Sequence, residues 1–234
     1  MPKKEKIQEM FDGIAGDYDR LNHIMSLGID RSWRRRAIKE IVQEGAEQEI
    51  LDIACGTGDF SIAIAKAMTP DSHVTGLDIS EGMLAVMRAK LKAEGLEGRA
   101  CCGQGDSEAM SFADGRFDRA AIAFGIRNFE HREKALREIL RVLKPGGKLV
   151  ILELSVPSNP VIRWFYKLYF TGILPVIGGR ISGDKAAYRY LPASVLHFPG
   201  KKEWMATMAS CGYKEVRHKA FTLGICRMYV GVKP

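Results

Sequence analysis

The stretch LDIACGTGD, residues 51–59, decides the fold, because an apolar run leads directly into two glycines. Gly56 and Gly58 tolerate positive φ and allow a ligand to approach the backbone closely. A helix that begins after such a turn presents free N–H groups and a partial positive charge at its N-terminus. The stretch therefore predicts a β-strand, a ligand-binding turn and a helix, the opening unit of a doubly wound α/β domain.

Outward from this turn, strand-like and helix-like segments alternate at short spacing, a pattern typical of βαβ units and a parallel sheet. We expect strands at residues 49–54, 73–77, 100–104, 117–124 and 148–154. We expect a turn at 144–147 and helices at 60–68, 81–94, 132–143 and 201–210. Ser80 is the expected N-cap of the helix at 81–94. Two last strands, near 214–219 and 224–232, complete a Rossmann-like, mostly parallel seven-stranded sheet.

Two segments fall outside this alternation and organise the chain. Residues 3–44 show helical periodicity throughout, so we expect residues 1–46 to form an N-terminal helical cap over the ligand site. Residues 47–234 then form the main domain. Within it, residues 160–200 are aromatic, basic and rich in Gly and Pro, and we expect them to form a helical insertion after the fifth strand that faces substrate or membrane.

The surplus of positive over negative charge lies in the C-terminal third of the chain. Residues 160–234 hold 12 Lys/Arg and 3 Asp/Glu, whereas the first 159 residues hold 23 and 25. Such a bias points to an anionic partner, either lipid headgroups or nucleic acid. A solvated basic face without a partner is the alternative interpretation.

The remaining composition favours a cytoplasmic protein. The five cysteines are odd in number and form no C-x-x-C pair, which indicates neither a disulfide framework nor a zinc site, and we expect no metal. The opening MPKKEK has no apolar stretch behind it, so we expect no signal peptide. The longest uncharged apolar stretch, residues 168–179, is too short to cross a bilayer.

Acidic residues after the next two strands separate a nucleoside from a dinucleotide. A dinucleotide-binding loop carries a third glycine where this chain has Ser61. Asp78, twenty residues after Gly58, is placed to accept from two ribose hydroxyls. Asp106 is placed to accept from an adenine amino group, although a turn or N-cap role is the alternative. Together these positions favour a nucleoside ligand without a pyrophosphate.

These residues and the run RVLKPGGKL, residues 141–149, resemble class I methyltransferases over residues 49–154. The resemblance implies S-adenosylmethionine as the cofactor. It also implies that the loop glycines and a set of polar side chains line the cofactor site: Thr57, Asp78, Asp106 and Ser107.

Two further segments are more specific, the patterned stretch 11–34 and FGIRN at 124–128; YRYL at 188–191 adds to them. They resemble the quinone C-methyltransferases of menaquinone and ubiquinone biosynthesis over nearly the whole chain. The resemblance implies methylation of a polyprenyl hydroquinone, demethylmenaquinol to menaquinol, with benzoquinol methylation as the alternative. The family usually has Ser before FG-x-RN, and this chain has Ala123, so any hydroxyl contact to the cofactor at that position is lost.

Arg127 and Asn128 are the candidate catalytic residues. They end the fourth strand, at the carboxyl edge where α/β enzymes place their chemistry. We expect Arg127 to face the phenolate oxygen of the substrate and Asn128 to position the ring. A salt bridge and a turn-forming Asn are the alternative interpretation.

Other candidates come from the helical N-terminus and from groups that could remove a proton. Tyr18, with Asp19, is placed to cover the cofactor as a lid, with ordinary helix packing as the alternative. The general base stays unassigned. Its candidates are His23, His131, Asp19 and Asp59.

Residues 162–170 contain five aromatics flanked by cations, a composition suited to a bilayer interface. We therefore expect peripheral contact with the anionic inner face of the membrane. A buried lid and a homodimer contact are the alternatives for the same aromatics.

Two other classes of protein share parts of this pattern. A nucleic-acid methyltransferase would use the same fold, but the chain has neither an Asn/Asp-Pro-Pro-aromatic motif after the fourth strand nor a Pro-Cys nucleophile, so we expect no nucleic-acid partner. A non-catalytic cofactor-binding protein is disfavoured by the intact glycine loop together with Arg127 and Asn128.

Overall fold

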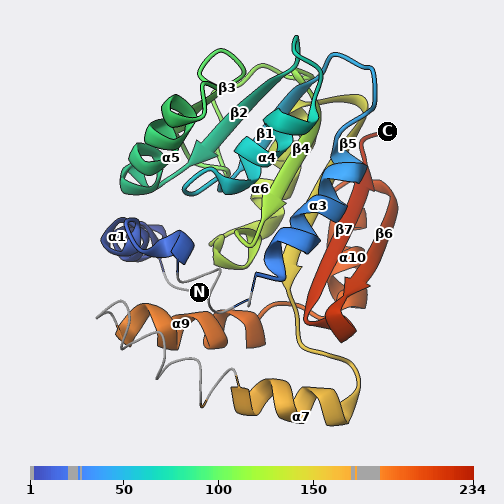
Figure 1. Ribbon diagram of the computed structural model, residues 1–234. Helices are drawn as coiled ribbons and strands as arrows, with labels where there is room; N and C mark the ends of the chain where they lie inside the picture. Colours follow the sequence, from blue (N-terminus) through green and yellow to red (C-terminus); the bar gives the residue numbers. More distant parts are fainter. Residues whose placement is uncertain (1–2, 21–25, 27, 170–171, 173–184) are drawn as a thin grey trace.

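Seven strands form one sheet at the centre of the molecule in a computed structural model, which describes residues 3–20, 26, 28–169, 172 and 185–234 (Figure 1). The strands are β1 (Glu49–Ile53), β2 (His73–Asp78), β3 (Ala100–Gln104), β4 (Phe117–Ala123), β5 (Leu143–Leu154), β6 (Lys214–Phe221) and β7 (Cys226–Val232). Their order is β3-β2-β1-β4-β5-β7-β6, and β7 alone runs antiparallel to its neighbours. The mostly parallel, doubly wound sheet is confirmed.

Helices cover both faces of this sheet (Figure 1). Those assigned in the described residues are α1 (Lys4–Ile14), α3 (Asp30–Ile41), α4 (Asp59–Ala67), α5 (Glu81–Ala93), α6 (Arg132–Val142), α7 (Pro160–Leu168), α9 (Lys185–Leu196) and α10 (Lys201–Ser210). The predicted cap of α5 is confirmed, because the Ser80 hydroxyl accepts from the Met83 N–H.

The core has one hydrophobic layer on each face of the sheet. On one face α3, α4 and α5 bury side chains such as Ile41, Ile64 and Met87 against the strands. On the other face α6 and α10 bury side chains such as Ile139 and Trp204. Because both faces are covered, the central strands read as continuous apolar runs rather than alternating ones.

Four expectations need correction. Residues 3–44 are not helical throughout, because α1 ends at Ile14 and Val42 is already extended. Of the two helices, α1 contributes to the wall of the cavity described below, while α3 packs on the sheet. The strand expected at 148–154 begins at Leu143, and its pairing with β4 jumps from Leu143 to Lys148, so residues 144–147 bulge out. A 3₁₀ turn at Thr222–Gly224 separates β6 from β7.

The helical insertion after the fifth strand is confirmed as α7 and α9, which lie below the end of the sheet in Figure 1. Asn159 caps α7 by accepting from the N–H groups of Val161 and Ile162, and Pro160 occupies the first turn. Within the described residues, none of the helices is long and apolar enough to cross a membrane.

The turn after β1 adopts backbone conformations that only some residues tolerate. Ala54, Gly56 and Gly58 all have positive φ, at 53°, 55° and 84°. Gly58 also lies against α5, where an added Cβ would stand 2.4 Å from Cγ of Met87. The second glycine of the turn is therefore required both for its φ and for its packing.

We expect Gly58→Ala to lower the free energy of unfolding more than Gly95→Ala. Both sites have positive φ, so each substitution costs about 1–2 kcal/mol of backbone strain. Only Gly58 adds a clash, because nothing lies within 4 Å of a Cβ at Gly95. Overpacking of this kind costs about 1–3 kcal/mol more. Urea unfolding of the two variants measures the difference, and equal losses would contradict the packing argument.

Candidate active site

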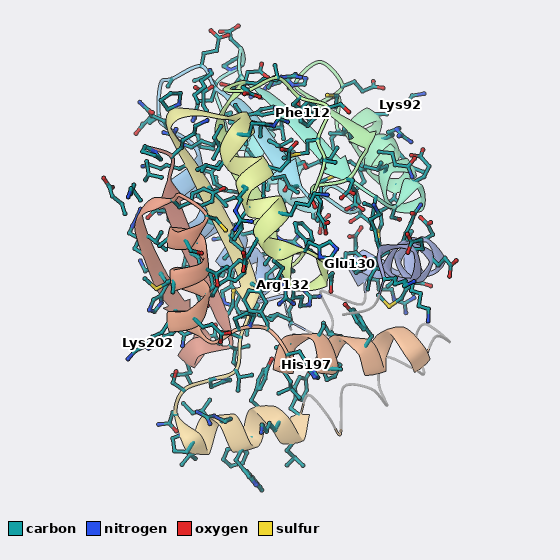
Figure 2. All side chains as sticks on the ribbon, turned by 180° about the vertical axis from the view of Figure 1, so that it is seen from behind. Lys92, Phe112, Glu130, Arg132, His197 and Lys202 are labelled. Atoms are coloured by element: carbon teal, nitrogen blue, oxygen red, sulfur yellow. The ribbon has the colours of Figure 1, made fainter. Side chains whose placement is uncertain are left out.

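A cavity opens where the carboxyl ends of four parallel strands meet. Ala54, Asp78, Gly105 and Phe124 line it, each at or just after the end of a strand. The other lining residues come from α1 and the segment after it, from the strand ends and the turns that follow them, and from the start of α5; Figure 2 shows Glu130 close to α1. They are Lys4, Ile7, Phe11, Tyr18, Gly56, Leu77, Ile79, Met83, Asp106, Ser107, Glu108, Ala123, Gly125, Asn128, Phe129 and Glu130.

Asp78 joins two neighbouring turns at this edge. Its carboxylate accepts from the N–H of Gly56 at 2.8 Å and from the N–H of Ser80 at 2.9 Å. Burial raises the pKa of Asp78 above its ordinary value, and the backbone donors oppose that rise. The group stands in the cavity wall beside Leu77, Ile79 and Met83, so an acceptor for hydroxyls lies next to an apolar surface.

Asp106 is tied to the N-terminal helix. One oxygen accepts from Nζ of Lys4 at 2.7 Å and the other from the N–H of Glu108 at 2.9 Å. Burial opposes its charge, but Lys4, the N–H of Glu108 and Lys134 together hold the pKa of Asp106 below its ordinary value. Both interpretations of Asp106 are thus compatible with its place, since it caps a turn and also lines the cavity.

Thr57 and Gly58 lie behind the cavity wall. The buried Thr57 hydroxyl donates to Asp19, which also pairs with Lys90. Lys90 reaches Asp59 at 2.6 Å, and Asp59 in turn pairs with Arg34 at 3.0 Å. This chain of charges fastens the segment around Asp19 to the glycine turn.

Asn128 and Tyr18 both line the cavity. Asn128 belongs to a 3₁₀ turn at Ile126–Asn128, and its side-chain oxygen accepts from the hydroxyl of Tyr190 at 3.0 Å. Tyr18 packs edge-on against Phe11 of α1, with ring centroids 5.9 Å apart. The cavity wall is therefore built from the residues around α1 and from the turn after β4.

Arg127 does not line the cavity. Its side chain is 5% exposed and pairs with Glu153 of β5 at 2.9 Å. It also donates to the hydroxyl of Ser194 in α9 and to the carbonyl of Phe124. Burial opposes its charge, but Glu153, with Tyr18 and Tyr190, raises the pKa of Arg127. The expectation that this guanidinium faces the substrate needs correction, because its donors are directed to protein groups beneath the cavity.

Three of the four candidate bases, Asp19, Asp59 and His131, do not line the cavity. Asp59 and Asp19 are held by the cations described above, and the net effect of Lys90 and Arg34, working against burial, is to lower the pKa of Asp59. His131 is exposed at the start of α6. His23 lies outside the described residues, as do residues 21–25 and 27 of the N-terminal motif and the side chains of residues 185–189.

Several residues of the site went unnoticed in the sequence. Glu153 had a signal, since it is a lone carboxylate in the apolar strand 148–154. Lys4 and Glu108 had none, because their place in the site depends on how distant segments pack.

Comparison with known proteins identifies the family. The model of the ubiE/COQ5 methyltransferase family matches residues 1–233. The chain belongs to this family. Its relatives include a demethylmenaquinone methyltransferase of Bacteroides fragilis, 44% identical over 99% of this chain and 94% of the relative. A second, of Thermus thermophilus, is 45% identical over 96% and 100%. The Geotalea daltonii protein named ubiquinone/menaquinone biosynthesis C-methyltransferase UbiE is 48% identical over 99% and 97%.

Solved structures agree on the fold of the family member. The [4+2]-cyclase SpnF aligns over 100% of this chain and 97% of its own, with TM-score 0.72 and 16% identity. A SAM-dependent methyltransferase from Aquifex aeolicus covers 86% and 89%, with TM-score 0.63 and 17% identity. Because a cyclase shares this fold with methyltransferases, the fold alone does not identify the reaction.

We expect Asp78→Asn to lower the affinity for S-adenosylmethionine by about 10- to 100-fold, the loss that follows when a charged acceptor disappears. Because burial raises the pKa of Asp78, this carboxyl is protonated as the pH is lowered. The affinity of the native protein should therefore fall at low pH, and the variant should lack that fall. Calorimetry across pH measures both effects. Asp71→Asn, on an exposed turn, is the control, and an unchanged Kd in Asp78→Asn would contradict the assignment.

Proposed function

We propose that this protein transfers a methyl group from S-adenosylmethionine to a ring carbon of a polyprenyl hydroquinone, converting demethylmenaquinol to menaquinol. The observation that carries the proposal is 44–45% identity, over nearly the full length, to relatives named demethylmenaquinone methyltransferase. A benzoquinol of ubiquinone biosynthesis is the second candidate acceptor, because the Geotalea relative is named for both pathways.

The residues of the cavity fit S-adenosylmethionine. The half-buried Asp78 accepts from two backbone N–H groups and pairs with no cation in the described part of the chain, so its carboxylate suits the ribose hydroxyls. Leu77, Ile79 and Met83 offer an apolar wall for the adenine, with Asp106 and Ser107 at its edge. When bound, the cofactor supplies an electrophilic methyl group on a sulfonium. Tyr18 and Phe11 then close the cavity on the side of α1.

Asn128 is the residue we place against the substrate ring. Its oxygen is engaged by Tyr190, so its amide N–H groups are left to donate toward the cavity. A donor directed at the phenolate oxygen stabilises the charge that makes the neighbouring ring carbon nucleophilic. The apolar surroundings strengthen this interaction, since Phe124 and Phe129 limit the access of water.

Arg127 acts in this proposal as a positioning residue. Its pair with Glu153 fixes the turn that carries Asn128, and Glu153 also accepts from the backbone N–H of Arg127 at 3.1 Å. Removing one member of a buried pair leaves an uncompensated charge and costs about 3–5 kcal/mol of stability. Arg127→Ala would therefore report on folding as much as on catalysis.

We also propose that α7 docks on an anionic membrane surface. Val161, Trp164, Phe165 and Leu168 are 63%, 61%, 60% and 53% exposed and recur at helical spacing, so the apolar stripe of the helix points outward. Exposed apolar patches of this kind mark interaction sites. Arg163 and Lys167 flank the stripe, a charge arrangement that suits anionic headgroups. The notion of a membrane contact at residues 162–180 also includes residues 170–171 and 173–180, which lie outside the described residues.

We expect Asn128→Ala to lower kcat by about 100-fold, as the loss of one transition-state donor does, while the Kd for S-adenosylmethionine stays the same. Tyr190→Phe should lower kcat less, because it only frees the orientation of the amide. The double variant should be no slower than Asn128→Ala, since the two act as one unit. Steady-state kinetics on all four proteins tests this, and multiplicative losses would contradict the coupling.

We expect the protein to sediment with anionic vesicles and to be released at high salt, because each basic residue near the surface contributes about 1 kcal/mol. Trp164→Ser with Phe165→Ser should reduce binding at all salt concentrations, and its melting temperature should match the native one because both side chains are exposed. Neutral vesicles are the control for charge. Equal sedimentation of variant and native protein would remove α7 from the docking surface.

A further inference from the structure

A second cavity lies between α7, α10 and β7, away from the site described above. Its volume is about 410 Å³. Four cations and one carboxylate line it, together with hydroxyls such as that of Ser158; the charged residues are Arg163, Lys201, Lys202, Arg227 and Glu203. Figure 2 shows Lys202 on α10, on the side of the molecule where α7 lies. Positive charge from three elements far apart in sequence thus converges on one hollow.

Arg227 is the residue that distinguishes this hollow from a solvated basic surface. It is 5% exposed, lies on β7 and lines the cavity. Its side chain hydrogen-bonds to two neutral groups, Ser158 at 3.3 Å and His218 at 3.4 Å, and both bonds are long. In the part of the chain that the structure describes, no carboxylate pairs with it within 4.0 Å. Glu153, its register partner in β5, forms its ion pair with Arg127, so the buried guanidinium has no carboxylate in contact with it, and an anion in the cavity would compensate its charge.

The surroundings of Arg227 add to the positive potential. The N-terminus of α10 opens into the cavity at Gly200, which offers no side-chain cap, so the first N–H groups of the helix are available to an anion. Burial lowers the pKa of His218, and the charges of Arg227 and Lys201 lower it further. Glu203 opposes an anion, but it is exposed and stands against four cations.

We propose that this cavity binds the phosphodiester group of an anionic phospholipid. A planar guanidinium binds two phosphate oxygens at once, and Arg227 is placed to do so with Lys201 and Arg163 around it. We choose a lipid over a free anion because of α7. This helix contributes Arg163 to the cavity lining, while its apolar stripe is exposed on the surface beside the cavity. The proposal rests on the docking of α7 but not on which quinol is methylated.

The test uses a lipid that needs no membrane. The full-length protein is titrated in a calorimeter with dihexanoylphosphatidylglycerol below its micellar concentration, and in parallel with dihexanoylphosphatidylcholine and with inorganic phosphate. We expect the anionic lipid to bind at least ten-fold more tightly than the other two. No binding of the anionic lipid overturns the site, and equal binding of inorganic phosphate shows a free-anion site and overturns the lipid assignment.

Three variants assign the binding to this cavity. Arg227→Gln should weaken it at least ten-fold, and the exposed pair Lys201→Gln, Lys202→Gln at least three-fold; the pair decides the question if Arg227→Gln fails to fold. Lys92→Gln, at the other end of the molecule in Figure 2, should bind like the native protein. Unchanged affinity in the lysine pair overturns the proposal. Turnover of a short-tailed, water-soluble quinol should be normal in that pair, which separates lipid binding from methyl transfer.

Discussion

The carboxylate of Asp78 is the interaction on which the cofactor edge of this fold depends. It closes the turn after β1 through Gly56 and the turn after β2 through Ser80, so two strand ends share one acceptor. Burying a carboxylate is unfavourable, and the rise in the pKa of Asp78 reflects that cost. The backbone N–H groups offset it only in part. A ligand with hydroxyl donors, such as a ribose, would supply the further hydrogen bonds that the Asp78 carboxylate can accept.

The strands and the glycine turn could be predicted because their signals are local. Apolar runs of five to seven residues and the spacing of Gly56 and Gly58 depend on the chain within a few residues of each position. The partners of charged side chains depend instead on packing. Lys4 meets Asp106 across 102 residues, and no pattern near either of them indicates the pair. The same reason explains why Arg127 was expected to face the substrate but is buried in a pair with Glu153.

The composition of the insertion did not decide its role, because the role depends on which side chains the register of the helix exposes. Five aromatics near two cations were equally compatible with a lid, a dimer contact and a membrane surface. In α7 the register turns Tyr166 inward, where burial raises its pKa, and leaves Trp164 and Phe165 exposed. A lid would require the opposite arrangement, with the larger apolar side chains buried. The outward stripe therefore favours a surface outside this chain.

The turn at residues 124–128 connects the cavity wall to the insertion. Phe124 holds φ at 61°, a strained value for a non-glycine residue, and its carbonyl accepts from Arg127. Arg127 reaches Ser194 of α9, and Asn128 is oriented by Tyr190 of the same helix. The insertion thus supplies groups that shape the substrate side of the cavity. Because Tyr166 of α7 and Val195 of α9 belong to one buried cluster, a contact made by α7 reaches the helix whose Tyr190 holds Asn128.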